Sequence, residues 1–218
     1  LVTNPVARPG AGTLEVWFKP TVLGVDGGLF RATASDGSAG YNVVPMASGK
    51  LVTYINAGAS KHYCTGTTAV AVGEWNHVVD VYGATAPSPR KMYLNGELDA
   101  TASVAVIPHY NIFQGRNYLG FRSGAVLDEL RFSKTVRSAD WIRAQNASMR
   151  DQLLSYGAEE GGHNDFLADY PFRRLLTVTN LGAISSTQVD FPVRVSLTSA
   201  NFSFNRSNPN GYDVRFTA

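Results

Sequence analysis

Apolar and polar side chains alternate over much of the chain, with the two-residue period of a β-strand. The clearest run alternates Trp75, His77, Val79 and Val81 with Asn76, Val78, Asp80 and Tyr82. A second run, residues 92–94, leads into Asn95-Gly96, and both of these residues tolerate the positive φ angles of a type I′ turn. The pattern predicts two strands joined by a loop, followed by a tight hairpin, at the centre of an antiparallel sheet.

The same alternation predicts more strands on both sides of this centre. Clusters of Gly, Ser, Asp and Asn, which favour turns, lie between them. These strands are residues 13–20, 27–34, 41–46, 51–56, 62–68, 117–122 and 125–132. Many short strands separated by turns, with no helix among them, predict an all-β, antiparallel jelly-roll β-sandwich.

One C-terminal helix is predicted after these strands. Ser138 is a suitable N-cap and Asp140 falls in the first turn. The residues that follow at helical spacing on one side are Ile142, Gln145, Met149 and Leu153. The predicted sandwich domain, helix included, spans residues 1–155.

The remaining residues predict a linker and a partial second β domain. Residues 156–171 lose the alternation and gather Gly and acidic residues, which is typical of a linker. Within 172–218 the alternation returns, and strands are expected at 173–179, 189–197 and 212–216. Three strands cannot enclose a core of their own. We therefore expect the chain either to be a fragment or to complete this sheet by pairing with another chain.

Composition narrows the class of protein. The formal net charge is +2 and the basic residues are scattered, whereas a nucleic-acid partner would need a clustered basic face. No stretch reaches the ~20 apolar residues of a membrane-spanning helix. The first residues, LVTNPVARPGAG, lack the pattern of a signal peptide. The single cysteine excludes an intrachain disulfide, and we expect Cys64 to be a buried apolar residue rather than a reactive thiol.

The carboxylates do not show the spacing of a glycosidase. Jelly-roll glycoside hydrolases need two carboxylates on the same face of the cleft. Asp128 and Glu129 are adjacent, so on a strand they point to opposite faces; Glu97 and Asp99 follow a tight turn and are expected on the solvent side. The sequence contains no His-x-His or His-x-x-x-His pair, no GxSxG motif and no phosphate-binding loop. We predict a protein that is not an enzyme.

Five motifs follow one another in the chain: EVWFKP, GEWNHVV, MYLNGEL, NYLGF and LDELRFSKTVRSADWI. In this order they resemble the laminin-G-like, concanavalin-A-like jelly-roll domains common in bacterial surface proteins. The resemblance implies a packed, hydrogen-bonded His77 and a structural role for the Asp128-Glu129 pair, with one carboxylate bonded to a neighbouring loop. Further on, NGYDVRFT, residues 210–217, is similar to the hallmark strand of an uncharacterised β-rich domain that often accompanies such domains.

Two groups of residues are candidates for binding. Related jelly rolls often hold calcium at the sandwich rim, and Asp26 and Asp36, each flanked by Gly, are the candidate ligands; Asx turns are the favoured alternative. No other cofactor is expected. An irregular stretch carries aromatic and amide side chains that could stack on and hydrogen-bond a sugar, although packing against the sandwich is the simpler explanation. These residues are Tyr110, Asn111, Phe113 and Asn117.

Three functions remain open. The resemblance implies a non-catalytic recognition or adhesion module, extracellular or on the cell surface, that binds a glycan or a cell-surface protein. The alternative is a structural subunit of a surface filament or layer, assembled from copies of itself by strand exchange. A glycoside hydrolase is the weakest of the three, because the paired carboxylates are missing.

Overall fold

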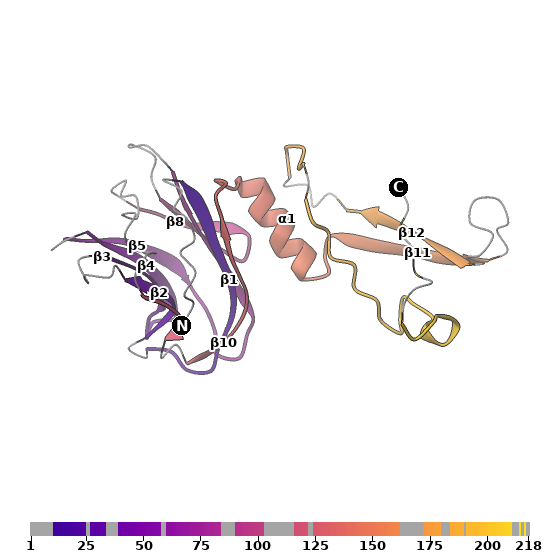
Figure 1. The fold of residues 1–218 in the computed structure, drawn as a ribbon, viewed down its shortest axis with the longest axis horizontal. Coiled ribbons are helices and arrows are strands. Elements are labelled where there is room, and N and C mark those ends of the chain that lie inside the picture. Colours follow the sequence, from indigo (N-terminus) through magenta and orange to yellow (C-terminus); the bar gives the residue numbers. More distant parts are fainter. Residues whose placement is uncertain are drawn as a thin grey trace. The chain divides into compact units, whose positions relative to one another are not determined.

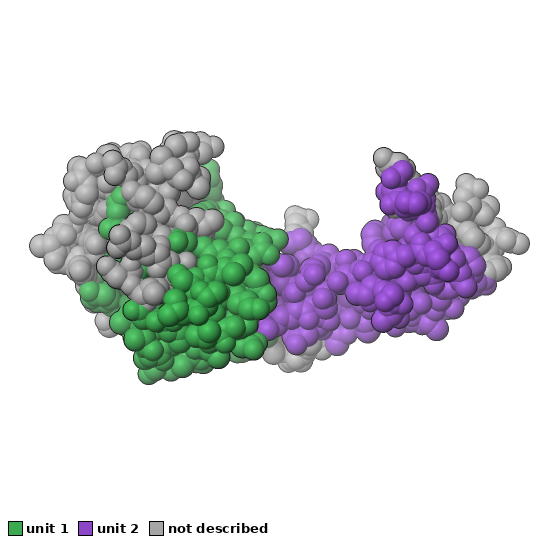
Figure 2. Space-filling view, turned by 90° about the horizontal axis from the view of Figure 1, so that it is seen from below, with its two compact units in different colours: residues 1–143 green, residues 144–218 purple. Residues whose placement is uncertain are grey.

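The computed structural model divides the chain into two compact units, residues 1–143 and 144–218 (Figure 2). The sequence placed the end of the first domain further on, at residue 155. The structure describes residues 11–24, 27–33, 39–57, 60–83, 90–102, 116–121, 124–161, 172–179, 184–189, 191–210, 214 and 216. In this part of the chain no helix has the length and apolar character that crossing a bilayer requires.

The first unit is a sandwich of two five-stranded antiparallel sheets (Figure 1). Sheet A has the order β10-β1-β6-β7-β8, and sheet B the order β5-β4-β3-β2-β9. The strands are β1 (Gly12–Pro20), β2 (Gly28–Thr33), β3 (Ala39–Pro45), β4 (Lys50–Ala57), β5 (Ser60–Ala69), β6 (Asn76–Tyr82), β7 (Lys91–Leu94), β8 (Glu97–Thr101), β9 (Arg116–Phe121) and β10 (Ala125–Ser133). The all-β, antiparallel jelly-roll prediction is confirmed.

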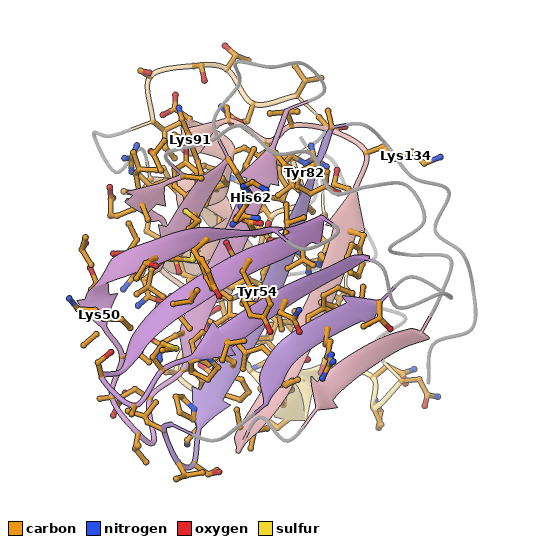
Figure 3. All side chains as sticks on the ribbon, turned by 90° about the vertical axis from the view of Figure 1, so that its left-hand side faces the viewer. Lys50, Tyr54, His62, Tyr82, Lys91 and Lys134 are labelled. Carbon is orange, nitrogen blue, oxygen red and sulfur yellow. The ribbon has the colours of Figure 1, made fainter. Side chains whose placement is uncertain are left out.

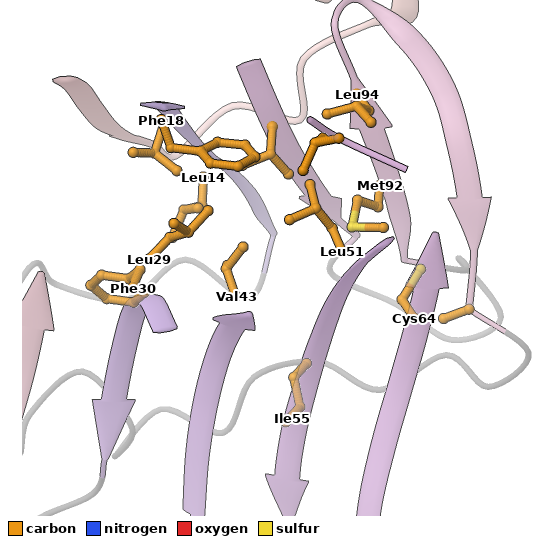
Figure 4. Close-up of a cluster of buried hydrophobic side chains, with 14 of the residues drawn as sticks. Leu14, Phe18, Leu29, Phe30, Val43, Leu51, Ile55, Cys64, Met92 and Leu94 are labelled. Atoms are coloured by element: carbon orange, nitrogen blue, oxygen red, sulfur yellow. The ribbon is translucent and has the colours of Figure 1, made fainter. Parts of the chain in front are cut away.

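The core lies between the two sheets and is built by the alternation seen in the sequence (Figure 4). Sheet A contributes Leu14 and Phe18, and sheet B contributes Leu51 and Ile55; all four are fully buried. Each side chain of this kind stabilises the fold by about 1.5–3 kcal/mol when it leaves water. Because inward residues recur at every second position, the residues between them face outward.

The predicted hairpin joins β7 to β8. Asn95 and Gly96 have φ angles of 53° and 90°, as a type I′ turn requires. The Asn95 side chain also accepts a hydrogen bond from the backbone N–H of His77 (2.9 Å), and the backbone N–H of Asn95 donates to the His77 carbonyl (2.7 Å). The turn is therefore tied to the start of β6, and the prediction for this dipeptide is confirmed.

Helix α1 (Ala139–Met149) begins as the sequence predicted. The hydroxyl of Ser138 accepts a hydrogen bond from the backbone N–H of Trp141 (3.1 Å), which is the geometry of an N-cap. The helix ends at Met149, so Leu153 lies beyond it and does not extend its apolar side.

In the second unit, β11 (Leu154–Gly161) pairs antiparallel with β12 (Phe172–Val178). The prediction of β12 is confirmed, but the predicted linker is wrong over residues 156–161, which lie in β11. The acidic residues that suggested a solvated linker are paired with basic residues of β12. The pairs are Glu159 with Arg174 (3.8 Å) and Glu160 with Arg173 (2.8 Å).

The strand predicted at 189–197 is wrong for its described residues. They belong to no strand, and two of their backbone groups bond to side chains instead. Ser196 accepts a hydrogen bond from the Tyr156 hydroxyl (2.9 Å), and Arg194 donates its N–H to the Ser148 hydroxyl (2.9 Å). A two-residue period favours an extended chain, but a strand also needs a neighbour. Only the short 3₁₀-helix η2 (Phe204–Arg206) follows among the described residues, and the strand predicted at 212–216 lies mostly outside them.

Candidate functional site

The outer face of sheet B carries exposed aromatic side chains. Thr53 and Cys64 are at most 1% exposed and point into the sandwich, so the neighbouring Tyr54 and Tyr63 point outward. Tyr63 is 50% exposed and Tyr54 is half-buried. In the view onto this sheet, Tyr54 lies over its middle (Figure 3). A ligand approaching sheet B from outside therefore meets these two rings.

Strand register places four side chains in one line across sheet B. Arg31 of β2 is opposite Asn42 of β3, which is opposite Tyr54 of β4, which is opposite Tyr63 of β5. We refer to Arg31, Asn42, Tyr54 and Tyr63 as the outer row. The rings of Tyr54 and Tyr63 lie 5.6 Å apart between centroids and are tilted by 45°. Two rings, an amide and a guanidinium thus come from four different strands.

Access along the outer row is uneven. Asn42 is only 4% exposed, because it lies between the longer side chains Arg31 and Tyr54. A ligand can therefore contact Tyr63 and Tyr54 directly, with Arg31, which is half-buried, at the far end of the row. Such a combination of aromatic faces and a few polar groups is typical of sites that bind small polar ligands such as sugars.

The structure brings together a set of residues that differs from the predicted one. Tyr110, Asn111 and Phe113 lie outside the described residues, and so do the candidate calcium ligands Asp26 and Asp36, so these assignments stay predictions. The backbone of Asn117 is described, in β9, where it pairs with Ala32. Among the described residues no group of three or more His, Cys, Asp or Glu side chains could hold a metal ion.

Sequence analysis missed the outer row. The alternation in residues 51–56 was a usable signal, because core positions at Leu51 and Ile55 require Tyr54 to face the other way. The pairing of Tyr54 with Tyr63 and with Asn42 was not available, because strand register depends on contacts between distant segments.

His77 takes the packed position that the resemblance implied. It is fully buried, its Nε2 lies 3.0 Å from Oε2 of Glu15, and its ring stacks on Trp17 with centroids 4.8 Å apart. Arg131 pairs with Glu15 (3.7 Å) and also with Glu129. This cluster lies on the outer side of sheet A, and its charges are paired within it.

Asp128 and Glu129 lie at a bulge in β10. Glu129 has a φ angle of 52°, and the register between β1 and β10 shifts here. Asp128 Oδ1 accepts a hydrogen bond from the backbone N–H of Glu129 (2.8 Å). One partner of this carboxylate is therefore within its own strand, and the expected bond to a neighbouring loop stays a prediction.

The prediction that both carboxylates after the hairpin lie on the solvent side is wrong for Asp99. Glu97 is exposed, as expected, and is held by Arg143 through two hydrogen bonds of 3.0 and 3.1 Å, which lower the pKa of its carboxyl. Asp99, however, is 9% exposed and accepts hydrogen bonds from the N–H groups of Thr67 (3.2 Å) and Thr68 (2.9 Å). It joins β8 to β5 and has a structural role, not a solvent-side position.

A buried ion pair crosses the core. Asp80 of β6 and Arg90 are 0% and 2% exposed, and Arg90 Nε lies 3.6 Å from Asp80 Oδ1. Arg90 also donates a hydrogen bond to the carbonyl of Thr53 in sheet B (2.7 Å). Cys64 lies close by; burial, together with the charge of Asp80, raises the pKa of its thiol to about 11. The prediction of a buried Cys64 is confirmed.

Two five-stranded antiparallel sheets with this strand order form a jelly-roll sandwich. The chain belongs to the Laminin_G_3 family of the concanavalin A-like lectin/glucanases superfamily, whose model matches residues 2–143. The family resemblance seen in the motifs is thereby confirmed. None of the curated proteins with which the chain was compared matches it.

Solved structures share the fold at low sequence identity. The CBM40 domain of the Ruminococcus gnavus IT-sialidase, bound to α2,3-sialyllactose, is 17% identical with a TM-score of 0.50 over 65% of this chain and 85% of that one. Domain 4 of AbnA, an extracellular GH43 arabinanase from Geobacillus stearothermophilus, in complex with arabinotriose, is 19% identical with a TM-score of 0.50 over 65% of this chain and 69% of that one. At such identities the likeness concerns the fold alone.

Proposed function

We propose that the sandwich unit is a non-catalytic, extracellular glycan-binding module that holds its ligand on the outer face of sheet B. The observation that carries the proposal is the outer row, in which Tyr54 and Tyr63 offer two neighbouring rings at an exposed sheet face. Both solved neighbours named above hold an oligosaccharide on this fold, so a glycan is a ligand compatible with the architecture.

The geometry of the rings suits a sugar. The apolar C–H face of a pyranose or furanose ring packs on an aromatic ring, and Tyr offers a large contact area with few rotatable bonds. Its hydroxyl can donate or accept a hydrogen bond at the edge of the same contact. Since Tyr63 is half exposed and Tyr54 is partly covered, we expect Tyr63 to supply the larger share of the binding energy.

Binding without turnover agrees with the placement of the described carboxylates. The strands of sheet B contain no Asp or Glu. Hydrolysis of a glycan held on this face would need two carboxyl groups there, about 5–10 Å apart. In sheet A, Glu15 and Glu129 are engaged by Arg131, and Asp99 is bonded to backbone N–H groups. We further propose that the sandwich unit attaches to a cell surface through this glycan, as the sequence resemblance implies.

The test is a glycan array followed by titration of the best ligand against variants. Tyr63→Ala should weaken binding about tenfold or more, as expected when an aromatic residue at the centre of a contact is truncated. The matched control is Leu98→Ala, which removes an equally exposed apolar side chain (53%) from sheet A and should leave affinity unchanged. Equal affinity of Tyr63→Ala and the unaltered chain would refute the proposed site.

A second candidate function is assembly of copies of the chain by strand pairing, which the second unit favours. Within the described residues β12 pairs with β11 alone, and Leu175 and Val178 are 68% and 60% exposed. A two-stranded sheet with an unpaired edge is a template for a further strand. If this edge mediates assembly, light scattering after size exclusion should detect oligomers, and Leu175→Lys should shift them to monomers. A monomer at all concentrations would eliminate this candidate.

A further inference from the structure

Exposed apolar side chains gather in the turns at one end of the sandwich. The turns are residues 21–24 after β1, 46–49 between β3 and β4, and 70–75 between β5 and β6. The exposed apolar side chains in them are Val22 (45%), Met46 (45%), Val72 (53%) and Trp75 (38%). We refer to these four residues as the apolar tip. Neither the glycan site on sheet B nor the strand edge in the second unit uses them.

Contacts between the three turns hold the apolar tip together. The N–H of Gly73 donates a hydrogen bond to the carbonyl of Pro20 (2.8 Å), which joins the third turn to the first. The carbonyl of Gly49 accepts a hydrogen bond from the start of the third turn (3.0 Å). A Cβ added at Gly24 would lie 2.7 Å from the Cβ of Ala47, so the first and second turns also touch. Each turn contacts the other two, and the four side chains therefore belong to one surface.

Backbone donors in these turns are bonded within the protein. The N–H groups of Thr21 and Val22 donate to the carbonyl of Gly124 (2.7 and 3.1 Å), and the Thr21 hydroxyl donates to the same carbonyl (2.7 Å). The N–H of Met46 donates to the carbonyl of Lys50 (2.8 Å). A backbone N–H that has no partner resists transfer out of water, and donors that are already bonded do not. The turns are therefore suited to contact with an apolar medium.

Positive charge lies on both sides of the apolar tip. Phe18 and Leu51 are fully buried in the core, so the residues next to them point outward. Lys19 is half-buried on the outer side of sheet A, and Lys50 is exposed on the outer side of sheet B, at the margin seen in Figure 3. Neither lysine takes part in an ion pair among the described residues. The described turn residues carry one charge, the exposed Glu74, which the two lysines outnumber.

We infer that the apolar tip inserts into the surface of a phospholipid bilayer that carries anionic headgroups. The aliphatic side chains leave water, Trp75 lies at the headgroup level, where an apolar ring with a polar N–H is favoured, and the lysines attract the anionic lipids. Four side chains are far fewer than the roughly 20–30 residues that each partner contributes to a stable protein interface. A bilayer, in contrast, requires no complementary shape.

The association should be weak and reversible. A single myristoyl chain binds bilayers with a constant of only about 10⁴ M⁻¹, and stable anchoring needs a second signal. Four partly exposed side chains with two lysines should bind no more tightly than this. Contact with a membrane through the apolar tip would therefore supplement binding at another site of the same chain rather than replace it.

The experiment is cosedimentation of the full chain with vesicles at millimolar lipid. One set of vesicles is phosphatidylcholine, and the other is an equal mixture of phosphatidylcholine and phosphatidylglycerol. We expect binding to the anionic vesicles, weakened about fivefold or more without phosphatidylglycerol or at high salt. Brominated lipids should quench the fluorescence of Trp75, whereas Trp17 and Trp141 are each only 7% exposed. Trp75→Phe should abolish that quenching.

Variants connect vesicle binding to the apolar tip. Val72→Glu should weaken binding tenfold or more. The matched control is Leu98→Glu, which places the same charge at an equally exposed position (53%) on β8 and should have no such effect. Lys50→Gln should weaken binding to the anionic vesicles about fivefold, and Glu74→Gln should strengthen it. Thermal unfolding of each variant verifies that it is folded.

The outcomes separate this inference from the proposed function. Failure to bind any vesicle, or equal losses in Val72→Glu and Leu98→Glu, would overturn it. Self-association in solution that Val72→Glu abolishes would also overturn it, because a second copy of the chain would then cover the apolar tip. Tyr63→Ala should leave vesicle binding unchanged; a loss there would place the lipid contact on sheet B and overturn the inference as well. None of these results depends on whether a glycan binds.

Discussion

Replacing Arg90 by Met should destabilise the sandwich by about 3–5 kcal/mol, because it leaves a buried carboxylate without its counter-charge. Asp80 is fully buried, so water cannot compensate for the missing guanidinium. Methionine fills much of the same volume, and the loss is therefore electrostatic rather than a loss of packing.

The contacts account for this magnitude. Arg90 Nη2 donates to the carbonyl of Thr53 at 2.7 Å, and the Thr53 hydroxyl donates to Asp80 Oδ1 at 3.3 Å. Arg90→Met removes the first of these bonds along with the ion pair, and a buried acceptor left unsatisfied costs about 1–3 kcal/mol. Since domains are stable by only about 5–15 kcal/mol, a loss of about 3–5 kcal/mol removes roughly a fifth or more of the stability.

The assay is urea unfolding of the full chain, followed by tryptophan fluorescence and circular dichroism. The double variant Asp80→Leu with Arg90→Met removes both charges, so it should be more stable than Arg90→Met alone by at least about 1 kcal/mol. A loss below about 1 kcal/mol in Arg90→Met would contradict the buried charge pair. So would a double variant less stable than the single one.

Three further outcomes are expected. Gly66→Ala should cost about 1–3 kcal/mol in urea unfolding, because a Cβ there would collide with the Asp99 carboxylate; unchanged stability would contradict the packing of β5 on β8. The pKa of Glu97 is lowered by Arg143 in the folded chain. The contribution of this ion pair to the free energy of unfolding is therefore fully present above the unfolded pKa of about 4.3, and it is lost as the pH falls through the folded pKa. The stability difference between the unaltered chain and Glu97→Gln, about 0.5 kcal/mol near neutral pH, should therefore shrink at acid pH. Cys64, with a buried thiol and a pKa of about 11, should resist alkylation at pH 8 until the chain is unfolded; rapid labelling of the native protein would contradict this.

Features that depend on consecutive residues could be predicted from the sequence. The alternation around Val79 and Val81 marked β6, Asn95-Gly96 marked the hairpin, and Ser138 marked the start of α1. Each of these signals is a local preference of the backbone or of a cap, and it acts over a few neighbouring residues. The order of the family motifs added the jelly-roll topology, which no single motif specifies.

Errors arose where an outcome depended on a partner from elsewhere in the chain. Glu159 and Glu160 suggested a solvated linker, but β12 offers them arginines and makes the segment a strand. Residues 189–197 alternate as a strand should, yet no neighbouring strand pairs with the described part. Asp99 was placed in solvent because its two N–H donors lie on β5, more than thirty residues away.

The sequence by itself determined which segments are extended, where the chain turns and which residues alternate between core and surface, because these depend on neighbours along the chain. Only the tertiary structure decided that Arg31, Asn42, Tyr54 and Tyr63 form one row across sheet B. Strand order and register join residues far apart in sequence, and they are set by how both apolar faces are buried together. The candidate site is a product of that joint packing.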